Sequence, residues 1–158
     1  MSKEIQKVLK KLEYGVYVVT LGKGSQGNAF TASWLTQVSS EPPMVALAIH
    51  DKHQSARLLR DIDGFVVHLI AQGQEAFAKT FYGPAESGYE KLKATSVEDS
   101  PATSSPLLKG ATGYLDCKIV NRVPCGNHTL FIAEVLAASL DSDTAILTCS
   151  GSNLRYTG

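Results

Sequence analysis

The amino-acid sequence predicts a mainly β protein, folded as a closed antiparallel barrel with a few helices packed outside it. Three observations support this fold class. Segments with the two-residue alternation of a strand, or with short apolar runs, outnumber segments with helical spacing. Hairpin-like connections outnumber crossovers, and residues 114–123 and 128–140 are long strand-like segments around a Pro-Cys-Gly-Asn turn. The chain has 158 residues and no internal repeat, which predicts a single domain over residues 1–158.

Three segments have the pattern of a helix. The first is SKEIQKVLKKLEYG, residues 2–15, in which Ser2 can cap the start and Gly15 ends the helix. Its apolar stripe consists of Ile5, Val8, Leu9 and Leu12. Residues 55–62 (SARLLRDI) predict a short helix that ends near Gly64, and residues 73–83 predict another.

The strands are read from apolar runs and from alternation. They are expected at residues 16–21, 27–38, 43–50, 64–71, 114–123 and 128–140, with residues 144–149 closing the sheet. The polar run KATSVEDSPATSSP, residues 93–106, predicts a surface loop.

The strand at residues 27–38 (GNAFTASWLTQV) has an unusual polar face. Its alternation assigns one face to Phe30, Ala32, Trp34 and Val38, and the other to Thr31, Ser33 and Gln37. A polar outer face is ordinary on an antiparallel strand, so this pattern alone predicts only a half-buried strand.

Composition excludes several functional classes. Fifteen Lys and Arg balance fifteen Asp and Glu, so the chain lacks the basic surface of a nucleic-acid-binding protein. No apolar run is long enough to span a membrane, and the polar N-terminus is not a secretory signal. The three cysteines, Cys117, Cys125 and Cys149, form no C-x-x-C pair and are read as reduced, mostly buried residues of a cytoplasmic protein.

Two short motifs match familiar patterns without their context. GKGSQG, residues 22–27, has the spacing of a dinucleotide-binding loop, but a strand-like segment follows it where a helix is needed. His50 and His53 form H-x-x-H, but nothing else in the sequence supplies a third metal ligand. We therefore read the first motif as a hairpin loop and expect no metal site.

The loop HDKHQS before the helix at residues 55–62 can be read in two ways. A helix start attracts phosphate, and Lys52, His53 and Ser55 would add donors there. Alternatively, Ser55 only caps the helix and Lys52 is solvated, which is the simpler reading from spacing alone. Together with the polar strand face, the loop suggests a groove for a planar polar ligand with a phosphate. Because no catalytic triad, P-loop or metalloprotease motif is present, the chemistry of an enzyme would come from a cofactor.

Four longer segments resemble the flavin reductase-like FMN-binding split-barrel family: TASWLTQVSSEPPMVALAI, GFVVHLIAQG, YLDCKIVNRVPCGNHTLFIAEV and GSNLRYTG. They are most similar to flavin reductase modules of flavodiiron proteins and rubredoxin fusions, and to flavoredoxin. The resemblance implies a six-stranded antiparallel Greek-key split barrel with a few peripheral helices, usually a homodimer. It also implies bound FMN, or sometimes FAD, with NADH or NADPH as the electron source.

The resemblance carries over to individual residues. The implied flavin contacts are Thr31, Ala32, Ser33, Trp34, Gln37, Val38, Ser39 and Ser40, and the implied phosphate-side loop contains His50, Asp51, Lys52, His53 and Ser55. His128 matches the histidine of the family's G-D-H motif and is the candidate catalytic residue. Two positions differ: Asn127 replaces the usual Asp, and His68 stands where Asn is common.

The leading hypothesis is an NAD(P)H-dependent oxidoreductase that reduces flavin and passes electrons to free flavin, a ferric complex or a redox protein such as rubredoxin or a flavodiiron protein. A second hypothesis is an FMN-bound electron carrier that hardly uses nicotinamide. A third is an oligonucleotide-binding barrel, against which the neutral charge and the single tryptophan both count.

Overall fold

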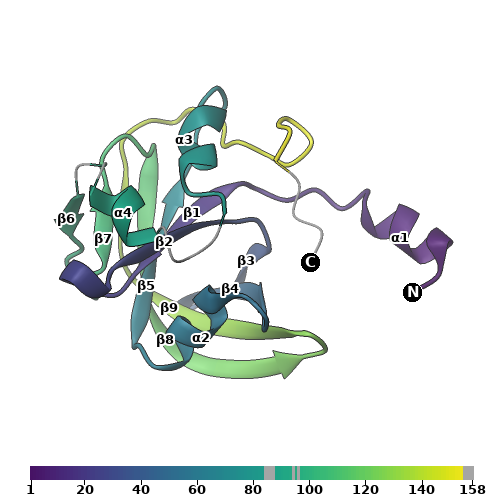
Figure 1. Cartoon of the computed structure of the whole chain (residues 1–158), viewed down its shortest axis with the longest axis horizontal. Coiled ribbons are helices and arrows are strands. Elements are labelled where there is room, and N and C mark those ends of the chain that lie inside the picture. Colours follow the sequence, from purple (N-terminus) through teal and green to yellow (C-terminus); the bar gives the residue numbers. More distant parts are fainter. Residues whose placement is uncertain (84–87, 94, 96, 155–158) are drawn as a thin grey trace.

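The computed structural model describes residues 1–83, 88–93, 95 and 97–154, and shows one large antiparallel sheet with short helices around it (Figure 1). The strands of this sheet are β1 (Tyr17–Leu21), β2 (Asn28–Ala32), β3 (Leu35–Ser40), β4 (Pro43–His50), β5 (Gly64–Leu69), β8 (Gly113–Cys125) and β9 (His128–Leu140). A second sheet contains β6 (Val97–Asp99) and β7 (Pro106–Leu108). The helices are α1 (Lys3–Leu9), α2 (Gln54–Arg60), α3 (Glu75–Thr80), α4 (Gly88–Lys93) and the short 3-10 helix η1 (Gly24–Gln26).

The main sheet has seven strands in the order β2-β1-β5-β8-β9-β4-β3, so the expected mainly β, antiparallel class is confirmed. The expected count of six strands is wrong. The segment at residues 27–38, read as one strand, is broken at Ser33 and Trp34 and forms both β2 and β3. These two strands stand at opposite ends of the strand order, so the chain passes from one edge of the sheet to the other within two residues.

Two other expectations about the sheet also need correction. Residues 144–149 do not form a closing strand; they make only the isolated bridges Gly15↔Thr148 and Ala71↔Ile146. The polar run at residues 93–106 is not all loop, because β6 and β7 pair there. Asp116 on β8 holds the turn between them by accepting bonds from Ala102 N at 2.7 Å and Thr103 Oγ1 at 2.6 Å.

The core lies on both faces of β1. Val19 packs in one buried cluster with Phe65 and Phe131, whereas its neighbour Val18 packs in a second cluster with Phe81. Because successive side chains of a strand point to opposite faces, a strand buried on both sides needs an unbroken apolar run. This explains why the segment at residues 16–21 shows no polar alternation.

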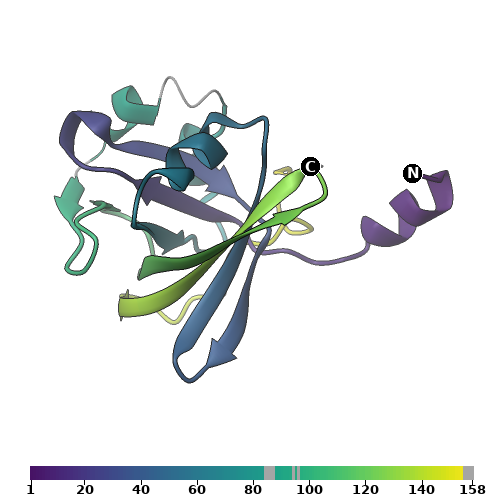
Figure 2. The same cartoon turned by 90° about the horizontal axis from the view of Figure 1, so that it is seen from below.

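Helix α1 forms with the expected cap, since the Ser2 side chain accepts a hydrogen bond from Ile5 N at 3.3 Å. It is shorter than expected and ends at Leu9. Both views show α1 at the end of an extended segment, away from the rest of the chain (Figures 1 and 2). Its apolar stripe is therefore exposed, with Ile5 at 52% and Val8 at 64% of their accessible surface.

Strands β8 and β9 form a long hairpin (Figure 1). Its middle section also exposes apolar side chains. β8 pairs with β5 only over residues 113–118, and from Val120 onward its described neighbour in the sheet is β9 alone. The exposed apolar side chains here are Val120, Val123 and Leu136.

Candidate functional site

Four aromatic side chains from separate parts of the chain meet at one place, and we call them the ring cluster: Trp34, His50, His53 and His128. The ring centroids of Trp34 and His128 lie 4.8 Å apart at an interplanar angle of 24°. His128 lies 5.0 Å from His50, which lies 5.6 Å from His53. The break between β2 and β3 therefore approaches the loop before α2.

The sheet register explains why these rings converge. His50 ends β4 and His128 begins β9, and the two are directly paired across the antiparallel ladder. Trp34 is tied to β4 by its carbonyl, which accepts a hydrogen bond from Ala48 N at 2.9 Å. His53 follows His50 by one tight turn, in which His53 N donates to His50 O at 2.9 Å.

Hydrogen bonds connect the turn before β9 to the loop after β4. The Asn127 side chain lies between two histidines, 2.7 Å from His128 Nδ1 and 3.4 Å from His50 Nε2. His50 Nδ1 accepts a bond from Lys52 N at 3.1 Å, and Asp51 N donates to Asn127 O at 3.0 Å. The side chain of Asn127 thus contacts the ring of His128, and the loop after β4 in turn contacts Asn127.

Burial, together with neighbouring groups, lowers the pKa of two of these imidazoles, His128 and His53. Burial lowers the pKa of His128, and His50 nearby lowers it further, while Asp51 opposes the shift. Burial also lowers the pKa of His53, again with a contribution from His50. A histidine with a pKa below its ordinary value is uncharged at neutral pH and can donate at one ring nitrogen and accept at the other.

Asp51 is already used within the protein. Its Oδ1 accepts a bond from Thr129 Oγ1 at 2.6 Å and lies 3.4 Å from Arg60 Nη2. It therefore stabilises the loop rather than offering a bare carboxylate. Lys52, the next residue, is exposed and places its ammonium group beside the ring cluster.

The first of the implied flavin contacts, residues 31–33, have side chains that turn toward the protein. Thr31 Oγ1 donates to Ala78 O of α3 at 2.7 Å. Ser33 is buried, and its hydroxyl oxygen accepts from Cys149 Sγ at 3.4 Å. Ala32 packs against the buried core. The expectation of an outer polar face is wrong for Ser33, which is buried, whereas Thr31 is half-buried with its hydroxyl bonded to α3.

The later implied flavin contacts, residues 37–40, are more exposed to solvent. Gln37, Val38 and Ser40 are exposed and Ser39 is half-buried, with Gln37 Nε2 donating to Ser39 O at 3.1 Å. A register irregularity between Gln37 and Ser39 interrupts the alternation. Val38 is consequently 51% exposed, contrary to the face that its spacing assigned to it.

Ser55 does not cap α2. His53 stands at the N-cap position, and Ser55 lies inside the helix with only 5% of its surface exposed. The simpler reading of the loop is therefore wrong in its detail, although the helix itself forms close to the expected place. Arg122 holds the other end of α2 through Nε to Leu59 O at 3.2 Å and Nη2 to Ile62 O at 2.6 Å.

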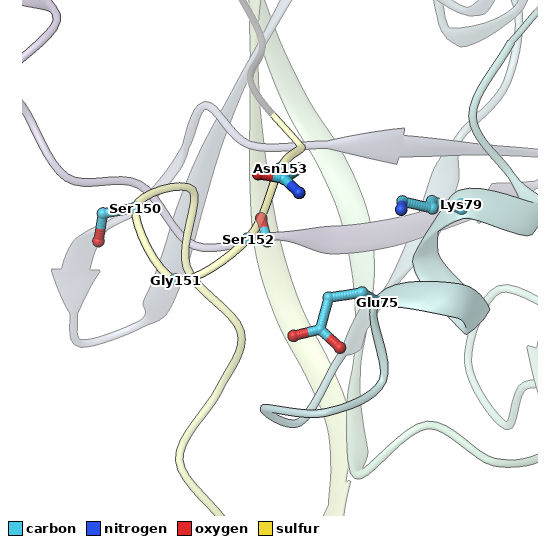
Figure 3. A pocket seen from close by; sticks show the side chains of 6 residues that line it. All are labelled: Glu75, Lys79, Ser150, Gly151, Ser152 and Asn153. Atoms are coloured by element: carbon cyan, nitrogen blue, oxygen red, sulfur yellow. The ribbon is translucent and has the colours of Figure 1, made fainter.

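A separate polar pocket of about 270 Å³ lies between α3 and the segment that follows Cys149 (Figure 3). Figure 3 shows Lys79 and Glu75 of α3 facing Ser150, Gly151, Ser152 and Asn153. Helix α3, which lines one side of the pocket, is bonded to β2 through the hydroxyl of Thr31. Sequence reasoning assigned no site here. The segment at residues 151–158 contributed only to the family resemblance, and its last four residues lie outside the described part.

His68 has a structural environment. It is 1% exposed, and Leu108 N donates to its Nε2 at 3.0 Å, so the proton of the neutral ring is on Nδ1, which lies 3.1 Å from Val18 O. Burial lowers its pKa from 6.5 to about 4. This histidine joins β5, β1 and β7 inside the protein.

Within the described ranges, no group of three or more His, Cys, Asp or Glu side chains is arranged to hold a metal ion. In the same ranges, the helices are too short and too polar to cross a membrane.

Comparisons with known proteins agree with the fold and the resemblance. A family model described as "Flavin reductase like domain" matches residues 9–158. An NADH:FMN oxidoreductase of Rhodococcus erythropolis is 31% identical over 135 residues, which are 85% of this chain and 69% of the relative. A protein named "Putative diflavin flavoprotein A 3", from a Nostoc strain, is 27% identical over 151 residues. That match covers 92% of this chain but 25% of the relative, so the chain spans only a quarter of that protein's length.

Solved structures give the same result. The NADH:FAD oxidoreductase of Streptomyces globisporus has a TM-score of 0.83 at 27% identity, covering 98% of this chain and 86% of that chain. Flavoredoxin from Methanosarcina acetivorans has a TM-score of 0.73 at 18% identity, covering 81% of this chain and 69% of that chain, and shows the shared fold alone.

Proposed function

Since the chain belongs to the flavin reductase-like domain family, we propose that it is an NAD(P)H-dependent oxidoreductase that binds FMN, with FAD as the alternative flavin. Two relatives support this activity by their names, NADH:FMN oxidoreductase and NADH-dependent FAD reductase. The observation that carries the proposal is the ring cluster, which joins the break between β2 and β3 to the loop before α2.

The chemical types of the side chains at this site suit a flavin mononucleotide. A planar aromatic ring system needs a flat wall, and the stacked Trp34 and His128 provide one. A phosphate needs nearby cations and donors, and the exposed Lys52 beside His53 supplies them. We assign the direct contacts to these residues and to Gln37, Val38, Ser39 and Ser40.

Residues whose side chains are engaged elsewhere receive a supporting role in this proposal. The hydroxyls of Thr31 and Ser33 bond to Ala78 and Cys149, and Ser55 is buried within α2. These side chains stabilise the segments that carry the direct flavin contacts, as Asp51 stabilises the loop before α2.

A bound flavin would supply the hydride acceptor, so that the protein need only bind and orient the two partners. Trp34, which is half-buried, lies against the ring of His128. His128, neutral because its pKa is lowered, can hydrogen-bond to flavin or nicotinamide without adding a charge. Replacing His128 with Ala should slow reduction more than it weakens flavin binding, whereas equal losses would indicate a purely structural contact.

The test is a binding titration followed by anaerobic stopped-flow. The purified protein should quench FMN fluorescence on binding, and the bound flavin should bleach rapidly with NADH or NADPH. A colourless protein that takes up neither FMN nor FAD would overturn the proposal and revive the oligonucleotide-binding alternative.

A second function is favoured by the diflavin flavoprotein match, in which this chain corresponds to one part of a larger protein. In that role the bound flavin would pass electrons between protein partners, with rubredoxin-like or flavodiiron-type proteins as candidates. Negligible bleaching with either nicotinamide, together with fast reduction by a reduced redox protein, would favour the carrier over the enzyme.

We also propose a homodimer. Exposed apolar side chains occur on α1 (Ile5, Val8) and on the β8–β9 hairpin (Val120, Leu136), and a second copy would bury them. Sedimentation should give twice the chain mass at micromolar concentration. Ile5→Asp tests the contribution of α1 and Val120→Asp that of the hairpin; a monomeric wild type would contradict the proposal.

We keep the cytoplasm as the expected location, which the three free cysteines support.

A further inference from the structure

The polar pocket beside α3 presents two charged side chains that the described part of the protein leaves unpaired. Glu75 and Lys79 line one side of it, and Figure 3 shows both facing the segment at residues 150–153. A glutamate four residues before a lysine is the helical spacing that favours an ion pair. Within the described residues, however, neither side chain forms an ion pair or a hydrogen bond. Both charges are therefore available to a ligand in a pocket of about 270 Å³.

The facing wall of the pocket is held in shape by hydrogen bonds. Ser150 N donates to Glu13 Oε1 at 3.1 Å, and Gly151 N donates to Thr148 Oγ1 at 3.2 Å. Hydrogen bonds from Ser150 lower the pKa of Glu13 below its ordinary value, so the carboxylate is charged at neutral pH and the bonds that it accepts are charge-assisted. The segment at residues 150–153 therefore presents its polar groups from an ordered backbone, which reduces the entropy cost of binding a ligand.

The pocket and the ring cluster contact the same two neighbouring residues, Glu13 and Tyr14. The Tyr14 ring lies 6.0 Å from the Trp34 ring, centroid to centroid, so it continues the line of rings beyond Trp34. Tyr14 O accepts a hydrogen bond from Cys149 N at 2.8 Å, next to the bond between Glu13 and Ser150. The wall of the pocket is thus tied to the residue that packs against Trp34. This arrangement suits one ligand that carries both a planar ring and a polar arm.

The chemistry of the pocket matches a ribose phosphate. An ammonium group pairs with phosphate, and a carboxylate accepts hydrogen bonds from hydroxyl groups. Pockets that enclose a whole drug-sized ligand have volumes of about 300–1,000 Å³, so this one suits part of a dinucleotide rather than all of it. The phosphate of FMN is assigned above to Lys52 and His53, at the opposite end of the line of rings. The remaining ligand of the proposed function is the nicotinamide nucleotide, which carries a ribose phosphate on its reacting ring.

We propose that the polar pocket binds the ribose and phosphate of the nicotinamide nucleotide, with Lys79 on the phosphate and Glu75 on the ribose hydroxyls. The inference rests on the proposed function in taking a nicotinamide nucleotide as the substrate. It adds a second part to the substrate site: the pocket sets the affinity for the nucleotide, while the ring cluster holds the reacting rings.

Amide NMR on the full chain without flavin tests the pocket directly, with oxidised nicotinamide mononucleotide as the probe. The nucleotide should shift the amide signals of residues 150–153 and of α3. Lys79→Gln should weaken this binding about five- to tenfold, because a charge-assisted hydrogen bond to phosphate is lost. Lys23→Gln removes an exposed lysine beside η1 and is the control, which should bind the nucleotide as the wild type does.

Two NMR results would overturn the proposal. One is a wild type in which nicotinamide mononucleotide leaves the signals of residues 150–153 unshifted, including the case in which FMN shifts them instead. The other is an unchanged affinity for the mononucleotide in Lys79→Gln.

Stopped-flow kinetics with bound FMN test the consequence for the reaction. Two hydride donors are compared: NADH, and an N-benzyl dihydronicotinamide that has the reacting ring without ribose or phosphate. Lys79→Gln should reduce the preference for NADH over the smaller donor about five- to tenfold, through KM rather than kcat, and Lys23→Gln should keep the wild-type preference. Equal losses with both donors would overturn the proposal, since they would show a general effect on the site. If NADH does not reduce the flavin of the wild type at all, the proposed function fails, and the NMR result alone decides the role of the pocket.

Discussion

The stability of this protein should fall in mild acid because of His68. This side chain is 1% exposed, and its two ring nitrogens contact Val18 O and Leu108 N, both of which suit the neutral ring. Burial lowers its pKa from 6.5 to about 4. Between these two values the unfolded chain binds a proton that the folded chain excludes, so stability decreases as the pH falls through this window.

The magnitude follows from the same two values. The full gap corresponds to about 3 kcal/mol, and about 2 kcal/mol of it should be lost between about pH 7.5 and about pH 5. The matched variant is His68→Asn, which keeps an N–H donor for Val18 O and removes the titrating ring. It should be less stable than wild type at neutral pH, because Leu108 N loses its acceptor at a cost of about 1–3 kcal/mol.

Urea denaturation at several pH values measures this effect, with the free energy of unfolding compared between wild type and His68→Asn. The other three histidines are present in both proteins, so their contributions cancel in the comparison. Wild type should lose about 2 kcal/mol more than the variant on going to about pH 5. Equal losses in the two proteins would refute the reasoning, because they would show that His68 is not held neutral in the folded state.

Three further results are expected. Asp116→Ala should lower the free energy of unfolding by about 3 kcal/mol, because it leaves Ala102 N and Thr103 Oγ1 without their buried acceptor; a loss below about 0.5 kcal/mol in urea denaturation would contradict this. Trp34→Ala should weaken FMN binding by about tenfold or more in a fluorescence titration, since it removes the stacked wall, and unchanged affinity would argue against the ring cluster as the flavin site. In the native protein, alkylation followed by mass spectrometry should modify the exposed Cys125 first; Cys117 should stay protected because burial raises its pKa to about 12, and its early modification would contradict this.

Much of the fold could be predicted from local patterns because most strands here carry their own signal. The apolar runs of β1, β4 and β5 and the turn between β8 and β9 appear in the sequence close to where the structure has them. The break at Ser33 and Trp34 could not be read in this way, because the alternation continues through it. It depends on contacts with Ala48 and Cys149, which are distant in sequence.

The same distinction applies to the candidate site. The sequence could identify three candidate site residues, His50, His53 and His128. Their convergence, however, depends on the register between β4 and β9. The cap of α1 was predicted correctly, and so was its apolar stripe except for Leu12, which lies beyond the end of the helix. Amphipathic spacing could not tell whether that stripe would be covered. The hydroxyls of Thr31 and Ser33 were misjudged because α3 and Cys149, which engage them, are placed by the tertiary fold.

The link between β2 and β3 has a practical consequence. It holds the single tryptophan of the chain and joins the two outermost strands of the sheet, so loosening of either strand changes the surroundings of one indole. Intrinsic fluorescence therefore reports on this region without a label or an engineered probe. A shift in its emission before global unfolding would locate the first opening of the structure at this junction.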